Sequence, residues 1–98
     1  MSTIELALKV FIVDDEPPAR NRLHDLLSDC NEQLPLTIVG EAGNGQEALE
    51  KLSELAADVV LLDIRMPQMD GIELAQHLQK LSKPPVIIFT TAYDFQET

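Results

Sequence analysis

Residues 59–63 read Val-Val-Leu-Leu-Asp, and the chain continues to Asp70-Gly-Ile-Glu73. A short apolar run that contains β-branched residues is typical of a strand buried on both faces of a sheet. Asp70, followed by Glu73 three residues later, is the signature of a helix N-terminus. The stretch therefore predicts a strand, an acidic residue at its carboxyl end, and a helix that packs back on the sheet.

The same alternation of strand and helix occurs on both sides of this stretch. Strands are predicted over residues 8–13, 36–41 and 86–89, and helices begin near Pro17 and Asn44. The helices carry apolar stripes that we expect to face the core: Ala19, Leu23, Leu26, Leu27 and Cys30 in the first, Ala48, Leu49, Leu52, Leu55 and Ala56 in the second, and Ile72, Ala75, Leu78 and Leu81 in the third.

Strands that alternate with helices form parallel sheets with right-handed crossovers. Three of the four strands are almost wholly apolar, which is expected when helices cover both faces of the sheet. We therefore predict an α/β fold with a doubly wound parallel sheet. Ligands of such sheets bind beyond the carboxyl ends of the strands, so the residues that follow each strand are the candidates for function.

The composition narrows the classes of function. The chain has 98 residues, 7 of them Lys or Arg and 17 Asp or Glu, for a net charge of −10. This length predicts one domain, over residues 1–98, and the charge argues against nucleic acid or anionic membranes as partners of this chain alone. One cysteine excludes an internal disulfide and a cysteine-built zinc site. No apolar run approaches the roughly 20 residues of a membrane span, and we expect a cytoplasmic location.

Acidic and hydroxyl side chains follow three of the predicted strands. Asp14 and Asp15 follow the first strand, Asp63 follows the third, and Thr91 follows the fourth. If the first and third strands are neighbours, the carboxylates of Asp14, Asp15 and Asp63 converge at one end of the sheet and repel one another. A hard divalent cation such as Mg²⁺ relieves that repulsion through oxygen ligands. Asp63 could attack phosphorus as a nucleophile, and Thr91 could donate its hydroxyl to a phosphoryl oxygen.

Three segments of the sequence resemble a known family. Phe11-Ile-Val-Asp-Asp-Glu-Pro17, Leu61-Leu-Asp-Ile-Arg-Met-Pro-Gln-Met-Asp-Gly71 and Phe89-Thr-Thr-Ala-Tyr-Asp94 are similar to the receiver domain of bacterial response regulators, the CheY-like superfamily. The finer detail resembles the LytR/AlgR family of two-component transcription regulators. The resemblance implies a flavodoxin-like sheet with strand order 2-1-3-4 and a fifth βα unit that these residues do not include.

The resemblance also implies a role for each candidate residue. Asp63 matches the aspartate that accepts a phosphoryl group from a sensor histidine kinase. Asp14 and Asp15 match the acidic pair that binds Mg²⁺ together with Asp63, and Arg65 matches the position whose backbone carbonyl binds the same ion. Thr91 matches the switch hydroxyl. The family implies a phosphorelay protein rather than an enzyme, acting on DNA through a downstream domain that is absent from this chain.

The sequence departs from the family pattern at its carboxyl end. The chain stops at Thr98, so we expect a receiver domain that is incomplete at its C-terminus. The lysine that the family uses as a counter-charge for phosphate is not present, and we expect poor phosphorylation of these residues alone. The strand over 86–91 would be an open apolar edge, which predicts a homodimer or another self-associated form.

Three other readings compete with this interpretation. Gly43-Asn-Gly-Gln-Glu-Ala48 fits a dinucleotide-binding fingerprint, although Glu47 would lie where a pyrophosphate should bind. A haloacid-dehalogenase-like phosphatase also uses a strand-end Asp and Mg²⁺, but it needs a second Asp where this chain has Arg65. The third is a receiver-like interaction module that is never phosphorylated.

The remaining singled-out residues are expected to be structural. Arg20, Arg22, His24 and His77 lie on predicted helices and are expected at the solvent-exposed surface. Met66 and Met69 flank a predicted turn and are expected to pack against neighbouring side chains rather than to form a contact surface for a partner.

Overall fold

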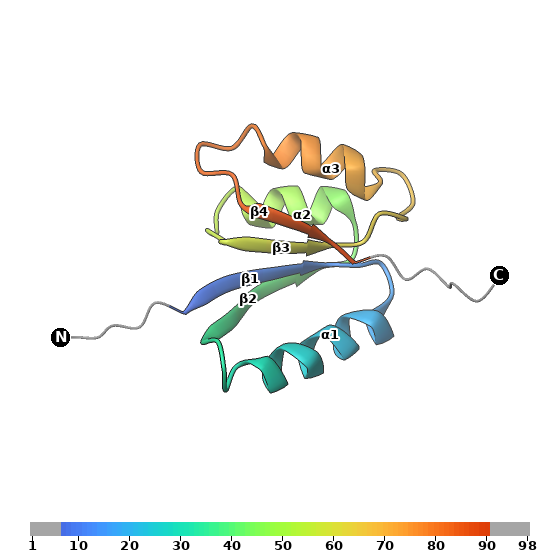
Figure 1. Cartoon of the computed structure of the whole chain (residues 1–98). Helices are drawn as coiled ribbons and strands as arrows, with labels where there is room; N and C mark the ends of the chain where they lie inside the picture. Colours follow the sequence, from blue (N-terminus) through green and yellow to red (C-terminus); the bar gives the residue numbers. More distant parts are fainter. Residues whose placement is uncertain (1–6, 91–98) are drawn as a thin grey trace.

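Four parallel strands form one sheet in the order β2-β1-β3-β4 (Figure 1). The computed structural model describes residues 7–90. The strands are β1 (Leu8–Val13), β2 (Leu36–Ala42), β3 (Val59–Leu62) and β4 (Val86–Phe89). Each neighbouring pair is parallel, which confirms the predicted 2-1-3-4 order.

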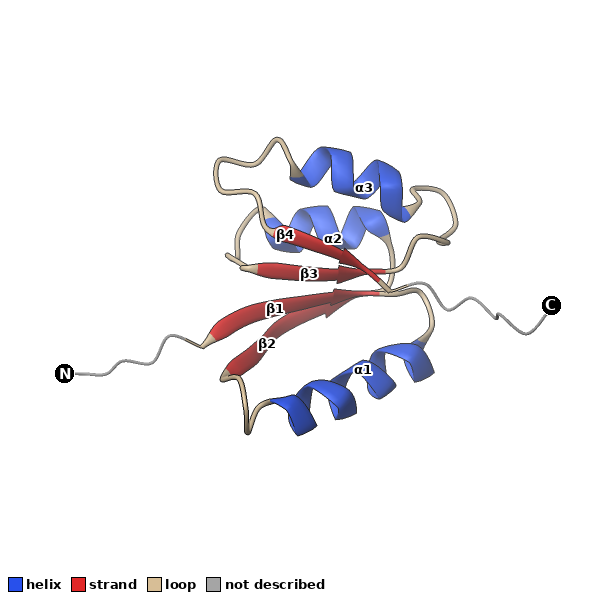
Figure 2. Cartoon of the chain, in the orientation of Figure 1, coloured by secondary structure: helices blue, strands red, loops and turns tan. Residues whose placement is uncertain are grey.

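Three helices connect the strands and cover both faces of the sheet. They are α1 (Pro17–Cys30), α2 (Gly45–Leu52) and α3 (Gly71–Leu78). Figure 2 shows α1 on one face and α2 with α3 on the other, so the sheet is doubly wound as predicted. The side chains of Asn44 and Asp70 accept the backbone N–H of Glu47 and Glu73, which confirms both predicted helix starts.

The core lies mainly between the sheet and the pair α2 and α3. Phe11 and Val13 of the central strand are fully buried, and they pack in one cluster with Leu62, Leu74 and Leu78. Because successive side chains of a strand point to opposite faces, the fully buried Ile12 faces the α1 side instead. The central strand is therefore apolar on both faces, and its carboxyl end is fixed by packing on either side.

An irregularity in β2 makes room for the largest core side chain. The register between β1 and β2 shifts by one residue, so that Val10 pairs with Ile38 while Phe11 pairs with Gly40. A Cβ at Gly40 would lie 2.9 Å from Cε2 of Phe11. Glycine at this position therefore lets the Phe11 ring lie directly against the β2 backbone.

Two helices are shorter than their apolar stripes predict, and β2 is one residue longer. α2 ends at Leu52 and α3 at Leu78. Leu55 and Leu81 nevertheless pack against the core from the turns that follow, whereas Ala56 is exposed. The apolar spacing thus continues past each helix end because the returning turn still lies over the sheet.

Some residues of the predicted stripes are exposed, which corrects those predictions. Leu26 is 58% exposed and Cys30 is also exposed, because α1 lies alone on its face among the described residues and one flank has no neighbour. Ile72 is 46% exposed because Leu74 and Leu78 form the inward face of α3 and Ile72 lies across the helix from them.

The strand β4 is an edge strand within the described residues. Val86, Ile88 and Phe89 are 61%, 48% and 41% exposed, and only Ile87 packs against the core cluster. This exposure confirms the predicted apolar edge. Within residues 7–90, no helix has both the length and the apolar character needed to cross a membrane.

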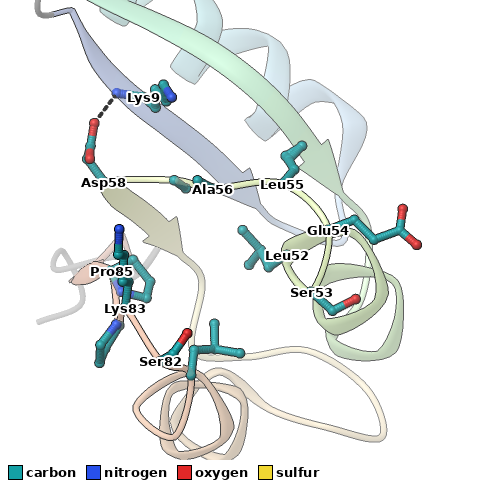
Figure 3. Close-up of a pocket in the computed structure, with 13 residues that line it drawn as sticks. Lys9, Leu52, Ser53, Glu54, Leu55, Ala56, Asp58, Ser82, Lys83 and Pro85 are labelled. Atoms are coloured by element: carbon teal, nitrogen blue, oxygen red, sulfur yellow. Dashed lines mark hydrogen bonds between the residues drawn. The ribbon is translucent and has the colours of Figure 1, made fainter.

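A depression of about 580 Å³ lies at the amino ends of the strands (Figure 3). Its lining comes from the start of β1, from the end of α2 at Leu52, and from the turns that lead into β3 and β4, including Leu55 and Pro85. The backbone N–H of Lys9 donates to Asp58 Oδ2 at 2.8 Å on its rim. The depression lies at the end of the sheet opposite the carboxyl ends of the strands. None of the predicted site residues lines it.

Candidate metal centre

Three aspartates meet at the carboxyl ends of the two central strands. Asp14 and Asp15 follow β1, and Asp63 follows β3. Val13 pairs with Leu62 at the end of this ladder, and the backbone N–H of Asp63 donates to Val13 O at 3.0 Å. One carboxylate oxygen from each aspartate lies within 4.8 Å of the others. The predicted convergence of these side chains is confirmed.

The cluster is largely shielded from water. Asp14 is 4% exposed and Asp63 is 7% exposed, while Asp15 is half-buried. Burial raises the pKa of the Asp63 carboxyl above its ordinary value, and the charges of Asp14 and, to a lesser extent, Asp15 raise it further. The backbone N–H of Arg65, whose nitrogen lies 3.4 Å from Asp63 Oδ1, lowers the pKa of Asp63 and so offsets part of this rise. The ionised cluster is therefore electrostatically unfavourable without a cation.

The donor set fits a hard divalent cation. Carboxylate oxygens are the ligands that Mg²⁺ prefers, and it commonly takes only one or two of them from the protein and fills its other positions with water or phosphate. Asp14, Asp15 and Asp63 supply such oxygens within reach of a single ion. The proposed role of the Arg65 carbonyl stays a prediction, because the contact seen at Arg65 involves its N–H.

The loop from Ile64 to Asp70 holds Asp63 against the start of α3. The backbone N–H of Gly71 donates to Ile64 O at 2.8 Å, and a Cβ at Gly71 would overlap the carbonyl oxygen of Asp63. Gln68 adopts a positive φ of 70°, which tightens the turn. Met66 is buried and Met69 packs on the core, so both methionines have the predicted packing role.

The fourth strand ends beside the same cluster. The backbone N–H of Thr90 donates to Leu62 O at 2.9 Å, one residue before Asp63. The predicted switch residue, Thr91, lies outside the described residues. The structure therefore brings the end of β4 to the site without describing the Thr91 hydroxyl.

Arg20 was expected to be solvated, and the structure corrects this prediction. Its Nη1 donates to the backbone carbonyl of Asp14 at 2.6 Å, and its Nε donates to Glu41 Oε1 at 3.1 Å. Only 21% of the side chain is exposed. The sequence places Arg20 in the first turn of the predicted helix that follows Asp14-Asp15-Glu16, but this position does not identify the two acceptors.

The glycine-rich turn before α2 does not favour a dinucleotide site. Glu47 Oε1 accepts the backbone N–H of Gly43 at 3.0 Å, and Asn44 Oδ1 accepts that of Glu47 at 2.8 Å. These are N–H groups that a pyrophosphate would require at a helix N-terminus. The Gly43 N–H bond is also the main reason why the pKa of Glu47 is lowered, so a negative charge already occupies this position.

A doubly wound parallel sheet, with a carboxylate cluster where its two central strands end, is the arrangement of an α/β module that could bind a divalent cation and a phosphoryl group. Comparison with protein families then identifies the member of this class: residues 10–98 match the response regulator receiver domain, and the chain belongs to that family. The phosphatase and dinucleotide readings are not favoured by this match.

Regulatory proteins of the predicted subfamily are similar to the chain. It is 49% identical over 87 residues to the sensory transduction protein LytR of Staphylococcus haemolyticus, covering 89% of this chain and 33% of that protein. It is 46% identical over 87 residues to the positive alginate biosynthesis regulatory protein of Pseudomonas aeruginosa, covering 89% of this chain and 34% of that protein. The chain thus spans about a third of the length of these curated relatives.

Solved structures show the same fold. The response regulatory domain of protein mrkE from Klebsiella pneumoniae superposes with a TM-score of 0.76 at 35% identity, covering 90% of this chain and 70% of that one. The response regulator domain of Thermotoga maritima CheB gives a TM-score of 0.75 at 36% identity, covering 88% of this chain and 61% of that one. The flavodoxin-like fold predicted from the sequence is confirmed.

Proposed function

We propose that Asp63 is the phosphoacceptor of this receiver domain and that a sensor histidine kinase is its phosphate donor. The observation that carries the proposal is the buried cluster of Asp14, Asp15 and Asp63, in which a carboxylate nucleophile lies beside two further carboxylates. Family membership supports the same assignment, since receiver domains act in two-component phosphorelays.

The proposed reaction is a phosphoryl transfer between two side chains. A carboxylate oxygen of Asp63 forms a bond to phosphorus while the bond from phosphorus to the donor histidine nitrogen breaks, and that nitrogen keeps the electron pair. Asp63 must be ionised to attack, and the raised pKa of its carboxyl works against ionisation. The residues around it therefore have to bring in positive charge.

Asp14, Asp15 and Asp63 would hold Mg²⁺ at this site. When bound, the ion supplies positive charge that offsets the carboxylates and the equatorial phosphoryl oxygens. The backbone N–H of Arg65 already approaches Asp63 Oδ1, and the tight turn at Gly71 keeps the carboxylate at the edge of the sheet. We propose that Thr91 and the Arg65 carbonyl complete the site, as the family resemblance implies.

The output of this domain is proposed from its relatives. The printed names of two similar proteins describe a sensory transduction protein and a regulatory protein, and the chain matches about a third of each. We propose that residues 1–98 form the receiver part of a cytoplasmic transcription regulator, with DNA bound by a separate domain. The net charge of −10 is consistent with a receiver that does not bind DNA itself.

Acetyl phosphate with Mg²⁺ tests the assignment without a kinase. We expect the mass of one phosphoryl group to be added to Asp63, slowly in the 98 residues and faster in a chain that also carries a fifth βα unit and its lysine. Asp63→Asn should remove the label, and Asp70→Asn, at an exposed aspartate of the next turn, should keep it. Label that survives Asp63→Asn, or no label on Asp63 in either length, would contradict the proposal.

We further propose that the chain self-associates through β4. Three of its four side chains are more than 40% exposed, and among the described residues the strand is paired only with β3. An apolar strand with a free row of backbone N–H and C=O groups is a template for pairing with another chain. A two-fold arrangement of two β4 strands is the simplest closed assembly.

A further inference from the structure

We propose that Arg20 is a positioning residue that holds the Asp14–Asp15 turn in its cation-binding geometry, an inference that rests on the proposed function of the site. Arg20 is not a ligand candidate, because it is positively charged. Its guanidinium instead contacts the backbone of Asp14, one of the three clustered aspartates.

The contacts of Arg20 form a closed circuit around Asp14. The N–H of Asp14 donates to Ala42 O at 3.1 Å, at the end of β2. The carbonyl of Asp14 accepts from Arg20, and Arg20 donates to Glu41, the residue that precedes Ala42. Both peptide groups of Asp14 are therefore tied to the end of β2, one directly and one through the guanidinium.

The carbonyl of Asp14 needs a donor of this kind. Asp14 is 4% exposed and lies between the end of β1 and the start of α1, outside both regular hydrogen-bond ladders. Among residues 7–90, the donor found for this carbonyl is Arg20 Nη1. A buried carbonyl without a donor is costly, so the turn would be expected to change its conformation if the guanidinium were removed.

The site specifically suits an arginine. The two acceptors lie on different elements, and the guanidinium reaches them with two different nitrogen atoms, which a lysine ammonium cannot do in the same fixed geometry. Gly43 contributes by leaving space, since a Cβ at that position would lie 3.3 Å from Arg20 Nη1. The guanidinium thus fills a gap between the β1–α1 turn, the end of β2 and the β2–α2 turn.

The charge of Arg20 and its geometry predict opposite effects on cation binding. A positive charge near a cation site weakens cation affinity, so an effect of charge alone would make Arg20→Ala bind Mg²⁺ more tightly. A positioning effect has the other sign, because outer-shell partners typically contribute a factor of about 10–100 in metal affinity. The direction in which the Mg²⁺ affinity of Arg20→Ala changes therefore separates the charge effect from the positioning effect.

The experiment is a Mg²⁺ titration of the 98-residue chain, followed by the amide NMR signals of the β1–α1 turn. We expect Arg20→Ala and Arg20→Lys each to weaken Mg²⁺ binding by about tenfold or more. Arg22→Ala is the matched control, since it removes the same charge from an exposed position on the same helix, and it should bind like the parent chain. Tighter binding by Arg20→Ala, or parent-like binding by Arg20→Lys, would overturn the proposal.

Two further measurements keep the test decisive. If Arg20→Ala does not fold, Glu41→Ala releases the guanidinium from β2 and should weaken binding in the same direction, whereas Glu41→Gln keeps an acceptor and should not. If the parent chain shows no Mg²⁺ response, the proposed metal site fails separately. The spectra of the metal-free variants then decide between the two outcomes. Changed amide shifts at Asp14 and Glu16 in Arg20→Lys, without such changes in Arg22→Ala, support a positioning role of Arg20. Unchanged shifts in Arg20→Lys overturn it.

Discussion

At the scale of single residues, Asp63 combines a nucleophilic carboxylate with an environment that disfavours its charge. Burial is the largest cause of its raised pKa, and the neighbouring Asp14 adds to it. A carboxyl whose pKa is raised by folding favours the folded state when protonated. That contribution is complete below the ordinary Asp pKa and is lost as the pH rises through the raised value, so the ionised group destabilises the metal-free fold at neutral pH.

Asp63→Asn should therefore stabilise the metal-free chain at neutral pH. The amide keeps the shape of the side chain and removes the charge, and a gain of about 1 kcal/mol would raise Tm by roughly 4–8 °C. The gain should shrink as the pH falls through the raised pKa toward the ordinary Asp pKa, because the folded carboxyl is then protonated and no longer carries a buried charge. Thermal unfolding followed by circular dichroism between pH 4 and 7 measures this. Asp70→Asn is the control, and a less stable Asp63→Asn chain at pH 7 would refute the argument.

Gly71 is the residue on which the position of Asp63 depends most directly. A methyl group there would overlap the Asp63 carbonyl oxygen, which is backbone and cannot move aside like a side-chain tip. We expect Gly71→Ala to destabilise the chain by about 1–3 kcal/mol, the usual range for overpacking, and to weaken Mg²⁺ binding. For stability alone, Gly43→Ala is the comparison, because its Cβ would meet the side-chain atoms Arg20 Nη1 and Glu47 Oε1, at 3.3 and 3.8 Å, rather than backbone. Urea unfolding of both variants shows the difference, and equal stabilities would contradict it.

The residues of the site were predictable to different extents. Asp14, Asp15 and Asp63 follow apolar parallel strands directly, so the sequence predicted their convergence on the condition that the first and third strands are neighbours, which the resemblance implied. Arg20 was not predictable in this way. Its contacts depend on the angle between α1 and the sheet and on the space left at Gly43, and neither is a local property of the chain.

At the scale of elements, the helix starts are determined by short polar signals. The Asn44 side chain caps α2, and Glu47 reaches back to Gly43 and also pairs with Lys51 at 2.9 Å. We expect Asn44→Ala to lower the free energy of unfolding by about 1 kcal/mol, while Asn44→Asp, an equally good cap, should restore it. Chemical denaturation gives the energies. Equal stability of the Ala and Asp variants would show that this cap does not stabilise α2.

Helix ends and exposed faces were less predictable than helix starts. Leu55 and Leu81 continue the apolar spacing although α2 and α3 have ended, because a turn that returns over the sheet also buries its apolar residues. Leu26 and Cys30 belong to an apolar stripe by spacing but are exposed. Periodicity shows which side of a helix is apolar, whereas burial depends on which other elements lie next to it.

At the scale of the whole molecule, the sheet is covered unevenly. Its central strands are enclosed by helices on both faces, while β4 presents Val86, Ile88 and Phe89 to solvent. The chain covers 70% of the Klebsiella domain to which it is similar, and these residues lie on the last described strand. Strand composition predicted a doubly wound parallel sheet, whereas the order 2-1-3-4 and the open edge at β4 were implied by the resemblance to receiver domains, because right-handed crossovers alone allow several strand orders.

The exposed edge leads to a prediction about assembly. We expect the 98-residue chain to sediment with an average mass that rises with concentration, and Ile88→Lys to shift it toward the monomer, since a charged side chain on an edge strand disfavours edge-to-edge pairing. Ile72→Lys is the matched control, because Ile72 is similarly exposed, at 46% against 48%, but lies on α3. Loss of association in both variants would show that the effect of the lysine is not specific to β4. Unchanged association in Ile88→Lys would place the interface elsewhere, and a monomeric parent chain at high concentration would rule out pairing through β4.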